Sequence, residues 1–149
     1  MATVILIAIT LIAAIAVAGF VFGLFGSATN SPNLSAAADQ VPAAMANGGA
    51  FTVSSSQGSC VTGVSCGLLS LGNTGTANTL AISVKLSYDG RTYTSTLATP
   101  LNAVADSTVF LYITALPAPA ANEPACGTEF IGSIATSDGA IVPFAGTFE

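Results

Sequence analysis

Hydrophobic residues follow two different patterns along the chain. Residues 4–25 form an almost unbroken apolar stretch, in which 14 of 22 residues are Leu, Ile, Val or Phe and Thr10 is the only polar side chain. A helix over this stretch is roughly 33 Å long at about 1.5 Å per residue, enough to cross the hydrocarbon core of a bilayer. Because the stretch has no polar face, we expect this helix to be buried on every side, in lipid or in a protein assembly.

From Phe51 onward, apolar and polar residues alternate with the two-residue period of half-buried strands. The clearest alternation runs over residues 82–88 and is followed by Asp89-Gly90, a strong hairpin signal. A type I′ turn at this site predicts four cross-strand pairs, with the apolar residues of both strands on one face. The predicted pairs are Tyr88 with Arg91, Leu86 with Tyr93, Val84 with Ser95 and Ile82 with Leu97.

A second Asp-Gly pair, at residues 138–139, separates two further strand-like runs, and Pro143 in the later run indicates an edge strand. Residues 51–55, 67–71 and 109–114 also read as strands. Seven short strands with turns between them favour an antiparallel, immunoglobulin-like β-sandwich over a small barrel or a jelly roll. The predicted fold class is α+β: a long N-terminal hydrophobic α-helix followed by this sandwich head.

The composition divides the chain into a hydrophobic helix (residues 1–29), a neck or linker (30–50) and the β-sandwich head (51–149). Pro32, Pro42 and Gly48-Gly49 punctuate the neck. Ser31-Pro32 is typical of a helix start, so we expect a short helix over about residues 33–40, ending before Pro42. Asn33 begins an Asn-Leu-Ser sequon, which makes it a candidate N-glycosylation site on an extracellular protein.

Charge is scarce, with 7 acidic residues, 2 basic residues and no histidine, and no charged residue precedes Asp39. The lack of histidine excludes a Ser-His-Asp triad and a His-ligated metal. Two basic residues make no basic patch for nucleic acid. The carboxylates are scattered, and no phosphate-binding glycine loop is present. We therefore expect no enzyme activity, no catalytic, metal or cofactor-binding residues, and no cofactor.

Three cysteines, Cys60, Cys66 and Cys126, fit one disulfide and one leftover thiol in an exterior domain. Their spacing leaves three pairings open. We favour Cys126 paired with Cys60 or Cys66, while a local Cys60–Cys66 link and three unbonded thiols remain alternatives.

Small residues recur at four-residue spacing in the N-terminal stretch, at Ala14 and Ala18 and again at Gly19 and Gly23. The second pair is a GxxxG pattern, which lets apolar helices approach closely. We predict helix–helix packing at these four positions. The stretch is too long and lacks the basic n-region for a secretory signal peptide, and it lacks the flanking basic residues that orient a plain membrane anchor. The simplest account is a basic leader that preceded Met1 and was removed, with a translation start at Met1 as the alternative.

The run over residues 2–23, ATVILIAITLIAAIAVAGFVFG, resembles the hydrophobic tail of archaeal type IV pilins, and residues 69–76 and 127–139 look like the sandwich heads of archaeal pilins and flagellins. The resemblance implies a class III signal peptide cut by a prepilin peptidase, a tail held in the membrane before assembly, and pilus assembly machinery as a partner. Members often carry several more residues, including Ser-Pro, ahead of this run, where this chain has Met1.

The sequence therefore predicts a structural subunit of an extracellular type IV pilus-like filament on the cell surface. The subunit is a homo-oligomer that polymerises through its N-terminal helix, and the resemblance implies surface adhesion as its use. Two alternatives are a membrane-anchored monomeric ectodomain that binds a ligand or partner, and a subunit of a motility filament, an archaeal flagellin.

Overall fold

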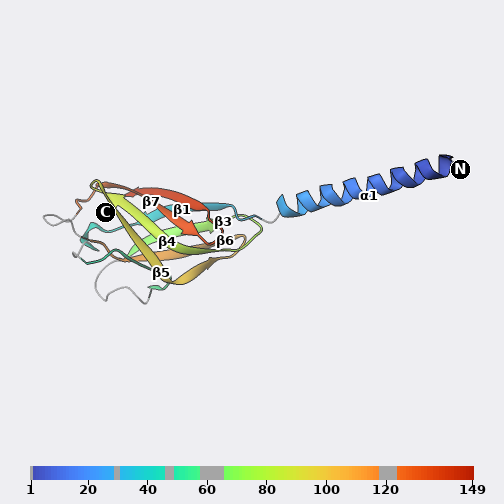
Figure 1. Cartoon of the computed structure of the whole chain (residues 1–149). Coiled ribbons are helices and arrows are strands. Elements are labelled where there is room, and N and C mark those ends of the chain that lie inside the picture. The colour runs from blue at the N-terminus through green and yellow to red at the C-terminus, as the bar shows by residue number, and fades with distance from the viewer. Residues whose placement is uncertain (1, 29–30, 46–48, 58–65, 118–123) are drawn as a thin grey trace. The chain divides into compact units, whose positions relative to one another are not determined.

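The computed structural model describes residues 2–28, 31–45, 49–57, 66–117 and 124–149. The chain divides into two compact units, Met1–Ser31 and Pro32–Glu149. The first unit holds helix α1 (Ala2–Ala28), and the second is a β-sandwich head (Figure 1). The predicted class, an apolar helix followed by an antiparallel β-sandwich, is confirmed.

The head is built from two antiparallel sheets of four strands, with strand orders β1-β3-β6-β2 and β5-β4-β7-β8. The central pairs are β3 with β6 in the first sheet and β4 with β7 in the second, which is an immunoglobulin-like outline. A short 3-10 turn, η1 (Ala43–Met45), follows β1. The strands are β1 (Leu34–Gln40), β2 (Thr52–Ser54), β3 (Gly67–Asn73), β4 (Thr79–Tyr88), β5 (Arg91–Ala103), β6 (Ser107–Ala115), β7 (Glu129–Thr136) and β8 (Ile141–Thr147).

Strand β1 corrects the predicted neck. The short helix expected over residues 33–40 is wrong, because Leu34–Gln40 is a strand that pairs with β3 and belongs to the head unit. Leu34, Ala36 and Ala38 alternate with exposed residues and pack against the core. Alanine favours helix in isolation, but this preference is weak and pairing with β3 outweighs it.

The hairpin β4–β5 confirms most of the predicted register. Tyr88 pairs with Arg91, Leu86 with Tyr93 and Val84 with Ser95. Asp89 and Gly90 have φ of 52° and 71°, as a type I′ turn requires.

The fourth predicted pair of this hairpin, Ile82 with Leu97, is wrong. The register shifts between Ala81 and Ser83, so that Ala81 pairs with Leu101. This irregularity changes which side chain enters the core, since Ala81 is fully buried and Ile82 is only half-buried.

The core lies between the two sheets and is closed by the last residues of the chain. Phe148 is buried, with its ring centroid 4.9 Å from that of Phe130 and 5.1 Å from that of Tyr88. Its backbone N–H donates to the Thr128 carbonyl over 2.9 Å. Burial and the neighbouring Tyr93 raise the pKa of the Tyr88 phenol, whose hydroxyl donates to the Pro117 carbonyl. Among the described residues, the aliphatic side chains with no exposed surface are Leu69, Leu71, Ala81, Val84, Leu86, Ala103, Leu111, Ile113, Leu116 and Ile134.

Asn73 ends β3 and is completely buried, yet every polar atom of its amide is paired. The side-chain NH₂ donates to the carbonyls of Ala77 and Ala103 over 2.8 and 3.0 Å. The side-chain oxygen accepts from the backbone N–H groups of Gly75 and Asn33, over 3.0 and 3.3 Å. One amide thus uses its full capacity of four hydrogen bonds to join the start of the head, the turn after β3 and the end of β5.

Gly132 on β7 provides space for an aromatic ring. It pairs with Phe144 on β8, and a Cβ placed on it would lie 2.3 Å from the Phe144 ring and 2.5 Å from the Lys85 backbone oxygen. Since the second neighbour is backbone, the strands would have to separate to admit a methyl group.

We expect Gly132→Ala to lower the free energy of unfolding of the head by about 1–3 kcal/mol through overpacking. Gly72→Ala is the matched control, because its Cβ would meet first the flexible Ser35 hydroxyl at 3.1 Å. Thermal or denaturant unfolding of the full chain in detergent measures both, and equal losses would contradict the argument.

The β7–β8 turn is held by a carboxylate. Asp138 accepts hydrogen bonds from the hydroxyls of Thr136 and, over 2.8 Å, Thr79. These bonds lower the pKa of Asp138 below its ordinary value. Gly139, with φ of 87°, completes the predicted turn, and Pro143 lies on β8 at the edge of its sheet, as expected.

A carboxyl whose pKa is lower in the folded state adds stability above its unfolded pKa and loses it as pH falls through the folded pKa. We therefore expect the wild-type head to lose more stability than Asp138→Asn when pH falls from about 6 to about 2. The difference is small, since Asp138 is exposed and solvent screens its charge. Denaturant unfolding at each pH checks this, and parallel pH profiles would rule it out.

Candidate assembly helix

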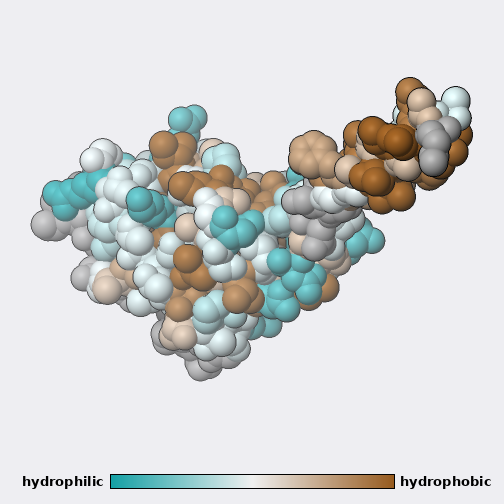
Figure 2. All heavy atoms as spheres, turned by 45° about the vertical axis from the view of Figure 1, so that its right-hand side comes forward, coloured by the Kyte–Doolittle hydropathy of each residue, from teal (hydrophilic) through white to brown (hydrophobic). Residues whose placement is uncertain are grey.

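Helix α1 is apolar on every side and exposed along the whole length over which its side chains are described. Every residue from Ala2 to Phe25 is exposed, including Val4, Ile12 and Phe22 at 68, 69 and 76 %. In Figure 2 hydrophobic side chains cover α1, whereas the visible face of the head is mostly pale with separate brown patches. A surface of this kind is not stable in water and needs an apolar environment around the whole helix.

The length and composition of α1 suit a membrane. Ala2–Phe25 is long and apolar enough to cross a bilayer, with a mean hydropathy of 3.0. Its helical backbone satisfies its own hydrogen bonds, as a spanning segment requires. The Thr10 hydroxyl donates to the Ile7 carbonyl over 2.9 Å, so it also needs no partner outside the helix.

The four predicted packing positions all lie on this helix. A Cβ added at Gly19 or at Gly23 would meet no atom within 4 Å. At 100° per residue, the Ala14–Ala18 pair and the Gly19–Gly23 pair point about 140° apart around the helix axis. Each pair can therefore admit a different neighbouring helix, a geometry that a polymer needs and a dimer does not. Packing at these positions stays a prediction.

Asn33, the candidate glycosylation site, is exposed in the described head unit, just before β1. Its backbone is fixed, since its carbonyl accepts from the Thr74 N–H over 2.9 Å and its own N–H donates to Asn73. Its modification stays a prediction.

The favoured cysteine pairing is wrong. Cys66 is disulfide-bonded, but Cys126 is a free thiol and exposed. Cys60 lies outside the described residues. The longer loop that a Cys126 link would close did not decide the pairing, because a disulfide depends on the local distance and orientation of the two residues.

Side chains that could bind a metal ion do not cluster on the described part of the head. No three His, Cys, Asp or Glu side chains come together there as ligands for a metal ion.

The sequence pattern did not reveal the role of Asn73, which looked like a turn residue. Its burial comes from contacts with segments 30 and 40 residues away in the sequence.

Comparison with known proteins gives distant structural likenesses. No protein-family model matches the chain, and no curated protein matches it in sequence. Among solved structures it is similar to the archaellum periplasmic stator protein FlaG from Sulfolobus acidocaldarius, at 15 % identity and a TM-score of 0.42, over 64 % of this chain and 99 % of that one. It is also similar to the archaeal flagellum of Methanospirillum hungatei strain JF1, at 19 % identity and a TM-score of 0.47, over 99 % of this chain and 92 % of that one.

Proposed function

We propose that this chain is a structural subunit of an extracellular type IV pilus-like filament, polymerising through α1. The observation that carries the proposal is a helix of 27 residues that is uncharged and apolar on every side, exposed from Ala2 to Phe25, and attached to a separately folded head. In a single subunit, a lipid bilayer can surround such a helix. In an assembly of many subunits, the helices can surround one another in a central bundle, with the heads on the outside.

A filament explains the two pairs of small residues on α1, which a membrane anchor does not need. An anchor needs only a hydrophobic surface, whereas a helix bundle needs positions of close approach on more than one side. Ala14 with Ala18, and Gly19 with Gly23, supply two such sides. Contacts between two different faces are head-to-tail, and they generate an open helical polymer when the rotation between neighbours does not close a ring.

The use and location of the filament follow from this role. We infer that the subunit resides in the membrane before assembly, after a prepilin peptidase has removed its leader, and that the assembled filament serves adhesion on the cell surface. The role is structural rather than catalytic. A motility filament would use the same helix, so attachment and swimming assays on a deletion strain separate the two uses.

Gly23→Leu tests the proposal directly. We expect it to reduce filament yield at least about tenfold, since a loss of about 1.4 kcal/mol per contact suffices, while the head unfolds as before. Leu24→Phe is the matched control, because it enlarges a residue that is already large on the same turn and points about 100° or more away from both small-residue pairs. Filament yield measured by electron microscopy and immunoblotting checks this, and a normal yield from Gly23→Leu would sink the proposal.

A further inference from the structure

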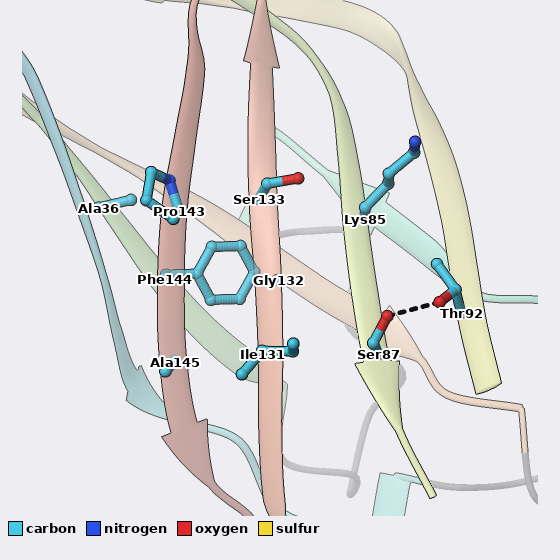
Figure 3. Close-up of a pocket in the computed structure, with 10 residues that line it drawn as sticks. All are labelled: Ala36, Lys85, Ser87, Thr92, Ile131, Gly132, Ser133, Pro143, Phe144 and Ala145. Atoms are coloured by element: carbon cyan, nitrogen blue, oxygen red, sulfur yellow. Dashed lines mark hydrogen bonds between the residues drawn. The ribbon is translucent and has the colours of Figure 1, made fainter. Parts of the chain in front are cut away.

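The outer face of the β4–β7–β8 part of the second sheet carries a groove of about 690 Å³ (Figure 3). The pleat directs Ile131 and Ser133 of β7 to this face, because Phe130 and Ile134 point into the core. Ser87 on β4 forms a hydrogen bond with Thr92 on β5 over 2.6 Å, which ties down one wall. The groove is therefore framed by paired strands.

The groove surface is suited to burial against protein. Apart from Lys85, Ile131 and Phe144 its lining side chains are small or compact: Ala36, Ser87, Thr92, Gly132, Ser133, Pro143 and Ala145. Small side chains lose little conformational entropy when they are covered. Two large apolar side chains also project from this face: Ile131 on β7, which is 64 % exposed, and Ile141 at the start of β8, which is 70 % exposed.

Charge indicates what covers this face. Lys85 is the only charged residue that lines the groove. The four strands of the opposite sheet contain a single charged residue, Asp39, which is exposed at the β1 irregularity between Ala38 and Gln40. The outer face of that sheet also presents Phe110, 44 % exposed, since Leu111 beside it is fully buried. Each head thus carries one cationic side chain in the groove, whereas its first sheet carries an exposed aromatic side chain on the outer face and an exposed carboxylate on its edge strand β1.

We propose that the β4–β7–β8 groove of one head receives the β1–β3–β6 outer face of a second copy of this chain, with Lys85 opposite Asp39. The inference rests on the proposed filament and names a contact between its heads. Because the two surfaces differ, the contact is heterologous and can repeat without closing, as a polar filament requires. Phe110 and the two isoleucines supply the apolar area, and the ion pair sets the register.

Charge exchange in the full-length chain, within its filament, tests this contact. Lys85→Glu places a carboxylate opposite Asp39, so filament yield after a wash in low salt should fall at least about tenfold. Asp39→Lys alone should cause a similar loss, and the double variant should restore most of the yield. Arg91→Glu is the matched control, since it makes the same charge change at the β4–β5 turn, outside the groove.

The outcomes separate this inference from the function on which it rests. If the unaltered chain forms no filaments, the proposed function fails. If it forms filaments and Lys85→Glu does so equally well, the head contact alone is overturned. Glu129 lies outside the groove but on the same outer face of β7 as Ile131. Rescue of Lys85→Glu by Glu129→Lys in place of Asp39→Lys would also overturn the inference, because that result indicates a closed, two-fold contact between the β4–β7–β8 faces of two copies. Unfolding measurements on each variant confirm that the heads remain folded.

Discussion

Asn73→Ala is expected to lower the free energy of unfolding of the head by about 3 kcal/mol. The substitution removes an amide that satisfies the carbonyls of Ala77 and Ala103 and the N–H groups of Gly75 and Asn33. Buried backbone groups left without a partner cost about 1–3 kcal/mol each, and local relaxation recovers part of the sum. Denaturant unfolding of the full chain in detergent measures the change.

Asn78→Ala is the matched control for Asn73→Ala. Asn78 lies in the same turn region and accepts one hydrogen bond, from the Ala105 N–H over 2.8 Å, but its side chain is exposed and water can replace it. We expect a loss below about 1 kcal/mol. Equal losses of stability in the two variants would mean that the hydrogen bonds of the Asn73 amide do not hold this end of the head together.

Ile12→Asp is expected to abolish filament formation. Ile12 lies near the middle of α1 and is 69 % exposed. A carboxylate at the centre of a membrane helix costs about 2.5–3.5 kcal/mol on insertion, and it meets a comparable penalty in a helix bundle without a cationic partner. The chain carries no basic residue before Lys85 to compensate it.

Filament counts and membrane fractionation measure the effect of Ile12→Asp, with Ile12→Leu as the control that preserves an apolar side chain. The head of both variants should unfold like the wild type, because α1 belongs to a separate unit. Abundant filaments built from the Ile12→Asp variant would mean that this side of α1 faces water, contrary to the proposed core.

The features that the sequence predicted well depend on neighbours in the chain. Helix α1 follows from an apolar stretch with no polar face, and its predicted range of 1–29 agrees with Ala2–Ala28. The β4–β5 register near the turn follows from Asp89-Gly90, whose positive φ angles fix the pairing of the residues beside it. Such local preferences operate whatever the rest of the fold does.

The features that the sequence missed depend on distant contacts. Strand β1 contains three consecutive alanines, and only pairing with β3 makes it extended. The irregularity at Ile82 depends on the sandwich core and not on the turn. The free Cys126 and the buried Asn73 likewise reflect which segments meet in three dimensions, and their spacing in the sequence carries little of that information.

The filament itself gives the most direct test of the central claim. Filaments sheared from cells that express this chain can be identified by mass spectrometry and reconstructed by electron cryomicroscopy. We predict that the chain is the repeating subunit, with α1 helices packed together in the core, close approach at Ala14–Ala18 and Gly19–Gly23, and β-sandwich heads on the outside. Surface filaments that lack this chain, with the protein retained in the membrane fraction, would contradict the account.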